Sequence, residues 1–396
     1  MKIKTLVLKI KALGRTIIAR TLGLTTSAYS NNSDTSTTRI MYVANAFIPT
    51  LQLSFVKPLS PLVESGEIST ELISEQQMKE LFGKQLRDST VHRWIDARLA
   101  AFRPTVIVFC RYSGPHAEYI IEQASGKNIP TILHIDDDLL NVPVEIGQKK
   151  YEYHNHPLRL AMVEHLLNNV SLIYSSTEAL KQRFQSYGYN NEIQVGQIYC
   201  SGEVLIPAIN RPVKKIGYMG FDHAHDFELV LPAIIQLLRR YPQIEFELFG
   251  SIPKPASLDE FGSRVKLIPP VPEYGAFMAK FSTLNWDIGL CPLALTSFNT
   301  VKANTKWVEY TSVGAAVVAS SGSVYDSCCA DNRGMLINTT EDWFNALEKL
   351  VLDNHHRFDL VSKAQVRLMQ DYSVASLREQ VLSVLHRANE IEAHRR

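Results

Sequence analysis

The chain lacks an excess of charge of either sign. Its 396 residues carry 41 lysines and arginines against 40 aspartates and glutamates, so the formal net charge is +1. Nucleic-acid binding depends on a basic surface, and no stretch of this sequence alternates basic and aromatic residues. We therefore predict no nucleic-acid partner. The apolar content of 45% is ordinary for a globular protein, and the length favours two domains.

Cysteine is scarce, and several well-known motifs are missing. There are five cysteines, with no CxxC pair and no zinc spacing, which is typical of a protein in a reducing compartment and predicts a cytoplasmic location. The sequence contains no Walker loop, no GxGxxG, no HExxH and no recognisable Ser/His/Asp triad. These absences argue against the nucleotide hydrolases, dehydrogenases and zinc proteases that carry those motifs.

The first 33 residues contain no acid and no apolar run of the ~20 residues that a membrane span needs. Basic residues instead alternate with apolar ones that recur at helical spacing. Residues 1–24 are therefore either an amphipathic helix on an anionic membrane surface or a disordered basic tail. The stretch 25–38 is rich in Ser, Thr and Asn and is interpreted as a linker. The basic residues are Lys2, Lys4, Lys9, Lys11, Arg15 and Arg20.

From residue 39 onward, short β-branched runs alternate with helical patterns, which indicates parallel sheets covered on both faces. The break at 207–212, where two prolines flank the sequence AINR, divides the pattern into domains at 39–207 and 213–372. Ligands of such sheets lie at the carboxyl ends of the strands. The predicted strands are 40–43, 105–109, 131–135, 171–174, 215–219, 245–249, 265–268, 287–290 and 315–319. The predicted helices include 91–101, 117–124, 157–167, 227–240, 276–281 and 343–352.

The segment 297–320 carries the strongest functional signal. We predict a polar capping loop (Ser297, Asn299, Thr300), a helix over 301–313 that stops at Gly314, and a buried strand. On that helix Lys302, Lys306 and Glu309 would share one face. Two lysines near a helix N-terminus suit a diphosphate, and the carboxylate beyond them suits sugar hydroxyls. The alternative is a solvated helix face with a Lys306–Glu309 ion pair.

Three further turns of the second domain are candidate donor contacts. Gly220 follows a strand and would let the backbone approach a phosphate, with His223 donating to an oxygen. Gly250 and Val271 follow the next two strands and would flank a nucleobase. The alternatives are ordinary turns, with Asp222 or Asp226 capping the helix, or a metal held by His223 and His225.

In the first domain, Asp136, Asp137 and Asp138 follow a predicted strand, and Arg111 ends another. Adjacent carboxylates are costly unless they are solvated, hydrogen-bonded or metal-bound. They are candidates for acceptor-side polar groups, for a general base, for a Mg²⁺ or Mn²⁺ site bridging a diphosphate, or for a plain solvated loop. Arg111 could bind phosphate or carboxylate with two parallel hydrogen bonds, and the alternative is a plain surface arginine.

Together these residues resemble the GT-B glycosyltransferases, in particular the family 4-like enzymes of bacterial surface polysaccharide assembly. The resemblance covers roughly residues 40–385. The motifs that carry it are Asn299-x-x-Lys302-x-x-x-Lys306-x-x-Glu309-Tyr310, Gly220-x-x-His223-x-x-Asp226, Asp287-Ile-Gly-Leu-x-Pro292, Arg111 and the run 135–139.

The resemblance implies two Rossmann-like domains facing a cleft, with a final segment, 373–396, whose helix crosses back to the first domain. It implies transfer of a sugar from a nucleotide-diphosphate sugar to a saccharide or lipid-linked acceptor, without a metal or other cofactor. The catalytic candidates are Asp136, Asp137 and Lys306. The donor-binding candidates are Gly220, His223, Gly250, Val271, Asn299, Lys302, Lys306 and Glu309, and those on the acceptor side are Arg111 and Asp138.

One position departs from the family pattern. Many retaining members carry two glutamates eight residues apart on the donor helix, whereas Val301 stands where the first would be. This leaves the stereochemical outcome open. It also keeps two other functions in play, a non-catalytic binding protein of the same fold and a GT-B sugar-nucleotide epimerase.

Overall fold

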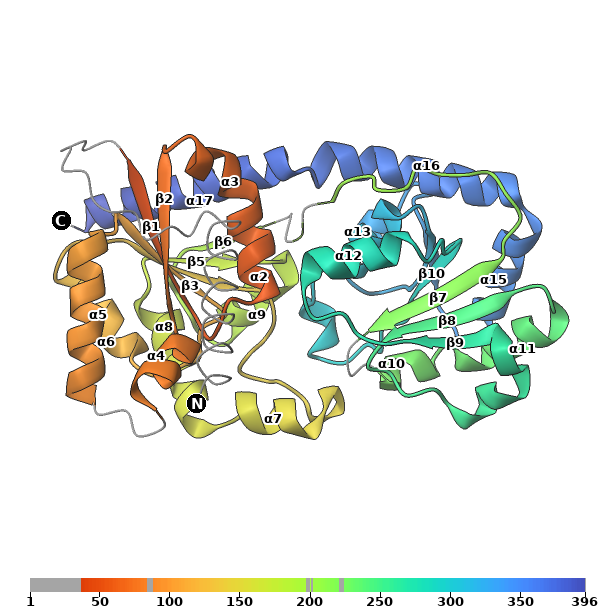
Figure 1. Ribbon diagram of the computed structural model, residues 1–396, viewed down its shortest axis with the longest axis horizontal. Coiled ribbons are helices and arrows are strands. Elements are labelled where there is room, and N and C mark those ends of the chain that lie inside the picture. The colour runs from red at the N-terminus through yellow and green to blue at the C-terminus, as the bar shows by residue number, and fades with distance from the viewer. Residues whose placement is uncertain (1–36, 84–87, 197–199, 201, 221–223, 396) are drawn as a thin grey trace, which may run out of the picture.

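The computed structural model describes residues 37–83, 88–196, 200, 202–220 and 224–395. The basic segment 1–24, nearly all of the predicted linker and His223 lie outside these residues. Two six-stranded sheets, each flanked by helices, form two domains that lie side by side (Figure 1). The predicted fold class, two doubly wound α/β domains, is confirmed.

The first sheet is parallel throughout, in the order β2-β1-β3-β4-β5-β6. The order reverses between β1 and β3, and the crevice at such a switch point is where ligands of these sheets bind. Central strands are buried on both faces, as all five residues of β3 show. The strands are β1 (Thr38–Ala44), β2 (Ile68–Ser74), β3 (Val106–Cys110), β4 (Thr131–Ile135), β5 (Leu172–Ser175) and β6 (Ile193–Val195).

The second sheet is also parallel, in the order β12-β11-β10-β7-β8-β9, with its switch point between β7 and β10. This is the strand order of the dinucleotide-binding folds. The strands are β7 (Lys215–Gly220), β8 (Glu245–Gly250), β9 (Val265–Ile268), β10 (Ile288–Cys291), β11 (Ala316–Ser320) and β12 (Met335–Ile337).

Nine of these strands lie within one or two residues of the predicted ranges, and β2, β6 and β12 were missed. The last two have only three residues each, and all three are at sheet edges. Strand β2 has the sequence ISTELIS and is largely half-buried, so it lacks the apolar run by which the inner strands are recognised. Short length thus explains the omission of β6 and β12, and the lack of an apolar run explains that of β2.

The helices of the first domain are α2 (Pro49–Leu51), η1 (Gln52–Val56), α3 (Lys57–Glu64), α4 (Glu75–Phe82), α5 (Asp88–Phe102), α6 (Ala117–Ser125), η2 (Val144–Ile146), α7 (Gln148–His154), α8 (Pro157–Asn169) and α9 (Glu178–Ser186). Those that follow are α10 (Ala224–Glu228), α11 (Leu231–Arg240), η3 (Ala256–Arg264), α12 (Tyr274–Ser282), η4 (Asn299–Val301), α13 (Thr305–Ser312), α14 (Asp326–Cys329), α15 (Asp342–Leu352), α16 (Asn354–Asp371) and α17 (Val374–His394). The predicted helix 227–240 is two helices, because Pro232 starts a new one in the first turn of α11. In the described part of the chain, no helix is both long and apolar enough to cross a bilayer.

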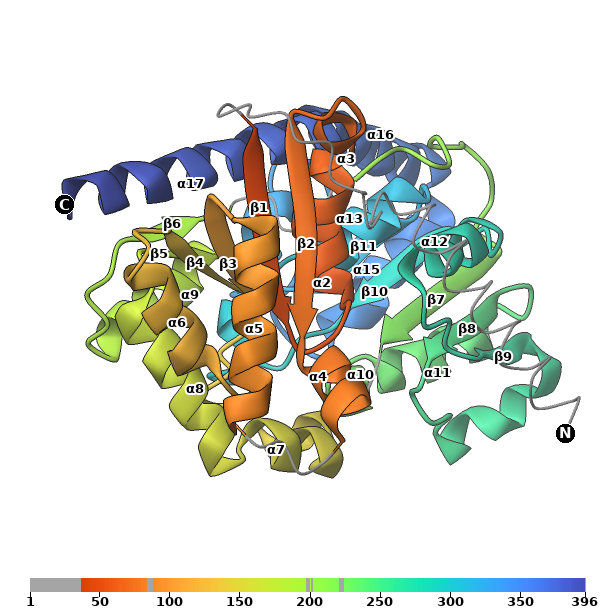
Figure 2. The same cartoon turned by 60° about the vertical axis from the view of Figure 1, so that its left-hand side comes forward.

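Helix α17 follows α16 of the second domain and runs along the first, and both views show the two helices together spanning the pair of domains (Figures 1 and 2). Leu377, Val381 and Leu385 of α17 are buried in a core that also contains residues of both sheets. Polar contacts add to this docking, since Arg378 Nε donates to the Pro58 carbonyl over 2.7 Å and Ser171 Oγ donates to Glu392 Oε2 over 3.0 Å. The last helix therefore belongs physically to the first domain.

A buried charge network joins the second sheet to helix α16. Asp287 is 1% exposed and accepts hydrogen bonds from the backbone N–H groups of Lys214 and Lys215 and from Arg211 Nε, each over 2.8 to 3.0 Å. Arg357, also buried, lies 3.6 Å from the same carboxylate. One carboxylate thus faces two arginines and accepts hydrogen bonds from two backbone donors.

Removing this carboxylate should be costly. We expect Asp287→Ala to lower the free energy of unfolding by about 3–5 kcal/mol, since Arg357 would remain buried without its counter-charge. Asp259→Ala is the matched control, because that aspartate is 65% exposed in its ion pair with Lys254 and should contribute less than about 1 kcal/mol. Urea unfolding of both variants measures the difference, and equal losses would contradict the network's importance.

Candidate functional site

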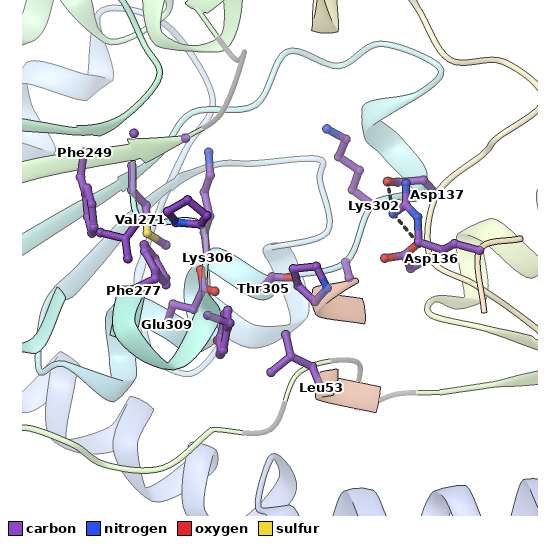
Figure 3. Close-up of a pocket in the computed structure, with 18 of the residues that line it drawn as sticks. Leu53, Asp136, Asp137, Phe249, Val271, Phe277, Lys302, Thr305, Lys306 and Glu309 are labelled. Atoms are coloured by element: carbon purple, nitrogen blue, oxygen red, sulfur yellow. Dashed lines mark hydrogen bonds and ion pairs between the residues drawn. The ribbon is translucent and has the colours of Figure 1, made fainter. Parts of the chain in front are cut away.

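A cavity of about 490 Å³ lies between the two domains, at the carboxyl ends of both sheets (Figure 3). It is lined by residues from both halves of the chain, so neither domain forms it alone. From the predicted set it collects Arg111, Asp136, Asp137, Gly220, Gly250, Val271, Lys302, Lys306 and Glu309. Its other lining residues are Pro49, Leu53, Lys150, Met219, Phe249, Pro272, Tyr274, Phe277, Ala303 and Thr305.

At the first-domain end, one arginine holds two carboxylates. Arg111 Nη1 lies 2.5 Å from Asp136 Oδ1 and 2.8 Å from Asp137 Oδ2 (Figure 3). Asp136 also accepts a hydrogen bond from Thr50 Oγ1 over 3.1 Å. Burial raises the pKa of Asp137, and the positive charge of Arg111 opposes that rise. The acidic pair is therefore paired and hydrogen-bonded, which corrects the alternative of a solvated loop.

The third carboxylate of the triplet is used elsewhere. Asp138 is fully buried and does not line the cavity. Its Oδ2 accepts a hydrogen bond from the Tyr187 hydroxyl over 2.8 Å and lies 3.4 Å from Arg183 of α9. Successive side chains point in different directions from the turn after β4, so Asp138 lies against α9 and not in the cleft where we had expected it.

At the second-domain end, the predicted single helix over 301–313 is wrong. A short turn, η4, ends at Val301, Lys302 is extended with φ −66° and ψ 161°, and α13 begins only at Thr305. Lys302 therefore does not share a helix face with Lys306 and Glu309, although all three line the cavity. The end of the helix is as predicted, with Gly314 in the left-handed region at φ 76°.

The interruption has a physical cause in Asp226, a fully buried residue of α10. Its Oδ1 accepts hydrogen bonds from the Ala294 backbone N–H over 2.8 Å and from Asn299 Nδ2 over 3.2 Å. Asn299 is 2% exposed, so its amide holds the loop together and neither caps α13 nor reaches the cavity. Asp226 thus ties this loop to α10.

The two lysines lie against aromatic rings. Lys306 Nζ is 4.6 Å from the ring centroid of Tyr218, and Lys302 Nζ is 4.9 Å from that of Phe298. Burial lowers the pKa of each lysine, while the nearby carboxylate of Asp137 counteracts the shift at Lys302. A half-buried pair of ammonium groups beside a helix N-terminus attracts anions such as a diphosphate.

Glu309 lies deeper, one turn along α13 from Lys306, and is 8% exposed. Burial raises its pKa to about 7, although a hydrogen bond from Tyr274 and the charge of Lys306 oppose the rise. Its carboxylate can therefore change its charge near neutral pH and can accept hydrogen bonds from ligand hydroxyls when ionised.

An apolar slot adjoins these charges. Phe249 and Phe277 stack with ring centroids 5.1 Å apart, and Val271 lies beside them (Figure 3). The sequence interpretation named Val271 but missed Phe277 and Tyr274. Their signal was Glu273, whose carboxylate accepts from the N–H groups of Gly275 and Ala276 and so starts α12, the helix that carries both rings.

Gly220 and Gly250 end neighbouring strands of the second sheet and pack against each other. A Cβ built on Gly250, whose φ is 128°, would stand 2.1 Å from the Gly220 carbonyl oxygen. A side chain at Gly250 is thus excluded by the backbone itself. The floor of the cavity at this edge is bare main chain.

A second cavity of about 720 Å³ shares Pro49 and Arg111 with the first and extends into the first domain. At its far side Glu75 is held by Arg159 and Lys79 at 2.8 and 2.6 Å. It is lined by Asn45, Ala46, Ile48, Pro49, Thr50, Glu75, Gln76, Lys79, Glu80, Arg111, Tyr153 and His154. Burial, aided by Arg111, lowers the pKa of His154 to about 4, so its imidazole is neutral at pH 7.

No group of three or more His, Cys, Asp or Glu side chains placed to hold a metal ion occurs among the described residues. The proposed pair of His223 and His225 is only half within them; His225 Nε2 lies 3.3 Å from Asp226 Oδ1.

No protein-family model matches the chain, and no curated protein sequence does. Solved structures do. Anabaena HepE in complex with UDP-glucose aligns over 88% of this chain and 99% of its own, with a TM-score of 0.60 and 14% identity. Sucrose-phosphate synthase from Thermosynechococcus elongatus aligns over 88% of this chain and 98% of its own, with a TM-score of 0.62 and 13% identity. A trehalose-6-phosphate structure from E. coli, bound with UDP-2-fluoro glucose, aligns over 88% of this chain and 99% of its own, with a TM-score of 0.57 and 13% identity. At these identities the likeness shows the fold, which is GT-B.

The ionisation of Glu309 provides a test of its role. We expect affinity for a nucleotide sugar to fall as the pH drops from 8 to 6, because protonation below about 7 removes a charged acceptor. Glu309→Gln should bind about tenfold more weakly or worse, consistent with the loss of a charge-assisted hydrogen bond of ~1.5–3 kcal/mol, and should show no pH dependence in that range.

Calorimetry with a panel of nucleotide sugars measures both effects, and Glu260→Gln on the exposed side of η3 is the control. Unchanged affinity in Glu309→Gln would contradict a role for Glu309 in binding the ligand.

Proposed function

We propose that this protein is a glycosyltransferase that moves a sugar from a nucleotide-diphosphate sugar to a saccharide or lipid-linked acceptor. The observation that carries the proposal is the single cavity in which an apolar slot, two lysines and a buried glutamate face an arginine-held carboxylate pair. The UDP-glucose and UDP-2-fluoro glucose bound by structures of the same fold support a donor of this class.

The donor fits the second domain by its chemistry. The base would lie against Phe249, Val271 and Phe277, and the diphosphate near Lys302, Lys306 and the N-terminus of α13. Glu309 would accept hydrogen bonds from ribose or sugar hydroxyls. When the bond between sugar and diphosphate breaks, negative charge develops on the leaving phosphate. Fixed cations in a half-buried site stabilise that charge without reorganising, which is the main catalytic demand on the donor side.

The acceptor would enter through the second cavity, which meets the first at Arg111. There it would find carboxylates, amides and the neutral imidazole of His154, which are suitable partners for sugar hydroxyls. Asp136 and Asp137 would orient the attacking hydroxyl, with Asp137, at 23% side-chain exposure, the more accessible of the two. Transfer requires the two substrates to approach within ~3–3.5 Å in a reactive geometry.

We also propose that no divalent ion is needed. Arg111 already occupies the carboxylates that would hold one, and two lysines supply positive potential for the diphosphate. A role in cell-surface polysaccharide synthesis, on the cytoplasmic side of the membrane, is the biological setting that the family resemblance suggests.

The central test is turnover. Incubation with nucleotide sugars and an acceptor panel should release free nucleotide and form a glycosylated product. Lys306→Ala should weaken both nucleotide binding and transfer, whereas Asp137→Asn should slow transfer at least tenfold more than it weakens binding. Lys266→Ala, an exposed lysine of β9, is the control and should change neither.

Other outcomes discriminate between the alternatives. A changed sugar without nucleotide release would indicate an epimerase, and binding without any change would indicate a non-catalytic protein. Activity that is abolished by excess chelator and restored by Mn²⁺ would contradict metal independence.

The basic segment 1–24 is proposed to contact the membrane surface. Full-length protein should bind vesicles containing anionic lipid, because each Lys or Arg near such a surface contributes on the order of 1 kcal/mol. A variant without these residues should remain in the supernatant on sedimentation while keeping its activity on soluble acceptors. Neutral vesicles are the control, and equal binding by both proteins would rule out the contact.

A further inference from the structure

The loop from Ala294 to Lys302 belongs to the second domain in sequence but is packed into the first. Phe298 and Val301 are 5% and 2% exposed, and both lie in the apolar core of the first domain that includes Leu180 and Phe184 of α9. They are the only second-domain residues in that described core. Separating the domains would expose both side chains.

Thr177, the N-cap of α9, and Arg183, within that helix, bind the same loop by hydrogen bonds. Thr177 Oγ1 donates to the Val301 carbonyl over 2.9 Å. Arg183 donates through Nη1 to Ser297 Oγ over 2.8 Å and through Nη2 to the Ser297 carbonyl over 3.0 Å. The forked contact fixes both ends of the guanidinium on one residue of the loop.

The loop is equally well tied to its own domain. Asp226 holds Ala294 and Asn299, and Asn299 Nδ2 also donates to the Ala294 carbonyl over 3.0 Å. The segment is therefore held by both domains, and Lys302 directly follows its last turn, η4. Lys302 in turn lies over the ring of Phe298.

Arg183 also reaches the acidic loop of the first domain, since its Nη1 lies 3.4 Å from Asp138 Oδ2. Asp138 directly follows the pair that Arg111 holds. One guanidinium thus contacts the segment carrying the acceptor-side carboxylates and the segment carrying a donor-side lysine.

We propose that Thr177 and Arg183 are positioning residues that latch the 294–302 loop onto the first domain and thereby set Lys302 for the diphosphate only when the domains are closed. The inference rests on the proposed function for the role of Lys302, but the latch itself is a property of the ligand-free protein. Closure of the two domains would therefore also complete the diphosphate site. In an open molecule, Lys302 would not be positioned to contact the diphosphate of a bound nucleotide sugar.

The first test needs no substrate. Hydrogen–deuterium exchange of peptides covering 294–304 should become at least about tenfold faster in Arg183→Gln than in the wild type, because local opening controls exchange. Arg387→Gln is the matched control, since that arginine joins α17 to Glu192 at 2.8 Å far from the loop, and it should leave these peptides unchanged.

Thr177 offers a second pair of variants. Thr177→Val removes the hydroxyl and should speed exchange of the same peptides, whereas Thr177→Ser keeps it and should not. Wild-type exchange of 294–304 in both Arg183→Gln and Thr177→Val would overturn the proposal.

The second test asks whether Arg183 acts through Lys302. Arg183→Gln should lower kcat/KM for the donor at least tenfold, and Arg183→Lys, which keeps the charge but loses the fork, should restore part of that loss. In the double variant with Lys302→Gln, the loss should scarcely exceed that of Lys302→Gln alone, because residues acting as one unit are not additive. If the two substitutions lowered kcat/KM by independent factors that multiply in the double variant, Arg183 would not act through Lys302, and its role would be limited to general stability.

The latch and the proposed function are tested independently of each other. If no nucleotide sugar is turned over by the wild type, the proposed function is wrong, yet the exchange data still decide whether the latch exists.

Discussion

The constraint on which the rest of this structure depends is the parallel pairing of every described strand in both sheets. A parallel sheet delivers each chain to the same edge, so the turns after β1, β3 and β4 must meet, as must those after β7, β8 and β10. When two such edges face each other, residues far apart in sequence are gathered without any specific affinity between them. Arg111 and Lys302 line one cavity for this topological reason.

Electrostatics then divides that cavity into unlike ends. The two cavity-lining carboxylates of the first domain share one cation, Arg111, whose charge offsets only one of the two. The second domain instead places ammonium groups against aromatic faces and a glutamate where burial raises its pKa to about 7. An anionic ligand is drawn to one end only, and the polar second cavity opens beside the other.

The sequence was sufficient for features set locally. Apolar runs predicted the inner strands, and the residues near their carboxyl ends, together with the helix that carries Glu309, predicted nine of the nineteen residues that line the cavity. It failed where a distant residue decided the outcome. Asp226 and α9 together bind the 294–302 loop, and these contacts prevent the predicted helix from starting at Val301. Asp138 was misplaced for a similar reason, because its partners Arg183 and Tyr187 stand 45 and 49 residues further along the chain.

The path of α17 has a consequence for how the protein is made. Its apolar face covers the first domain next to η1 and α3, yet it is the final helix of the described chain to be synthesised. While the ribosome is still adding the second domain, Phe55 and Leu59 of the nascent first domain lack that cover. The first domain can complete its folding only after translation has passed Glu392. A stalled or truncated chain would therefore expose an apolar surface that chaperones can bind, even with both sheets complete.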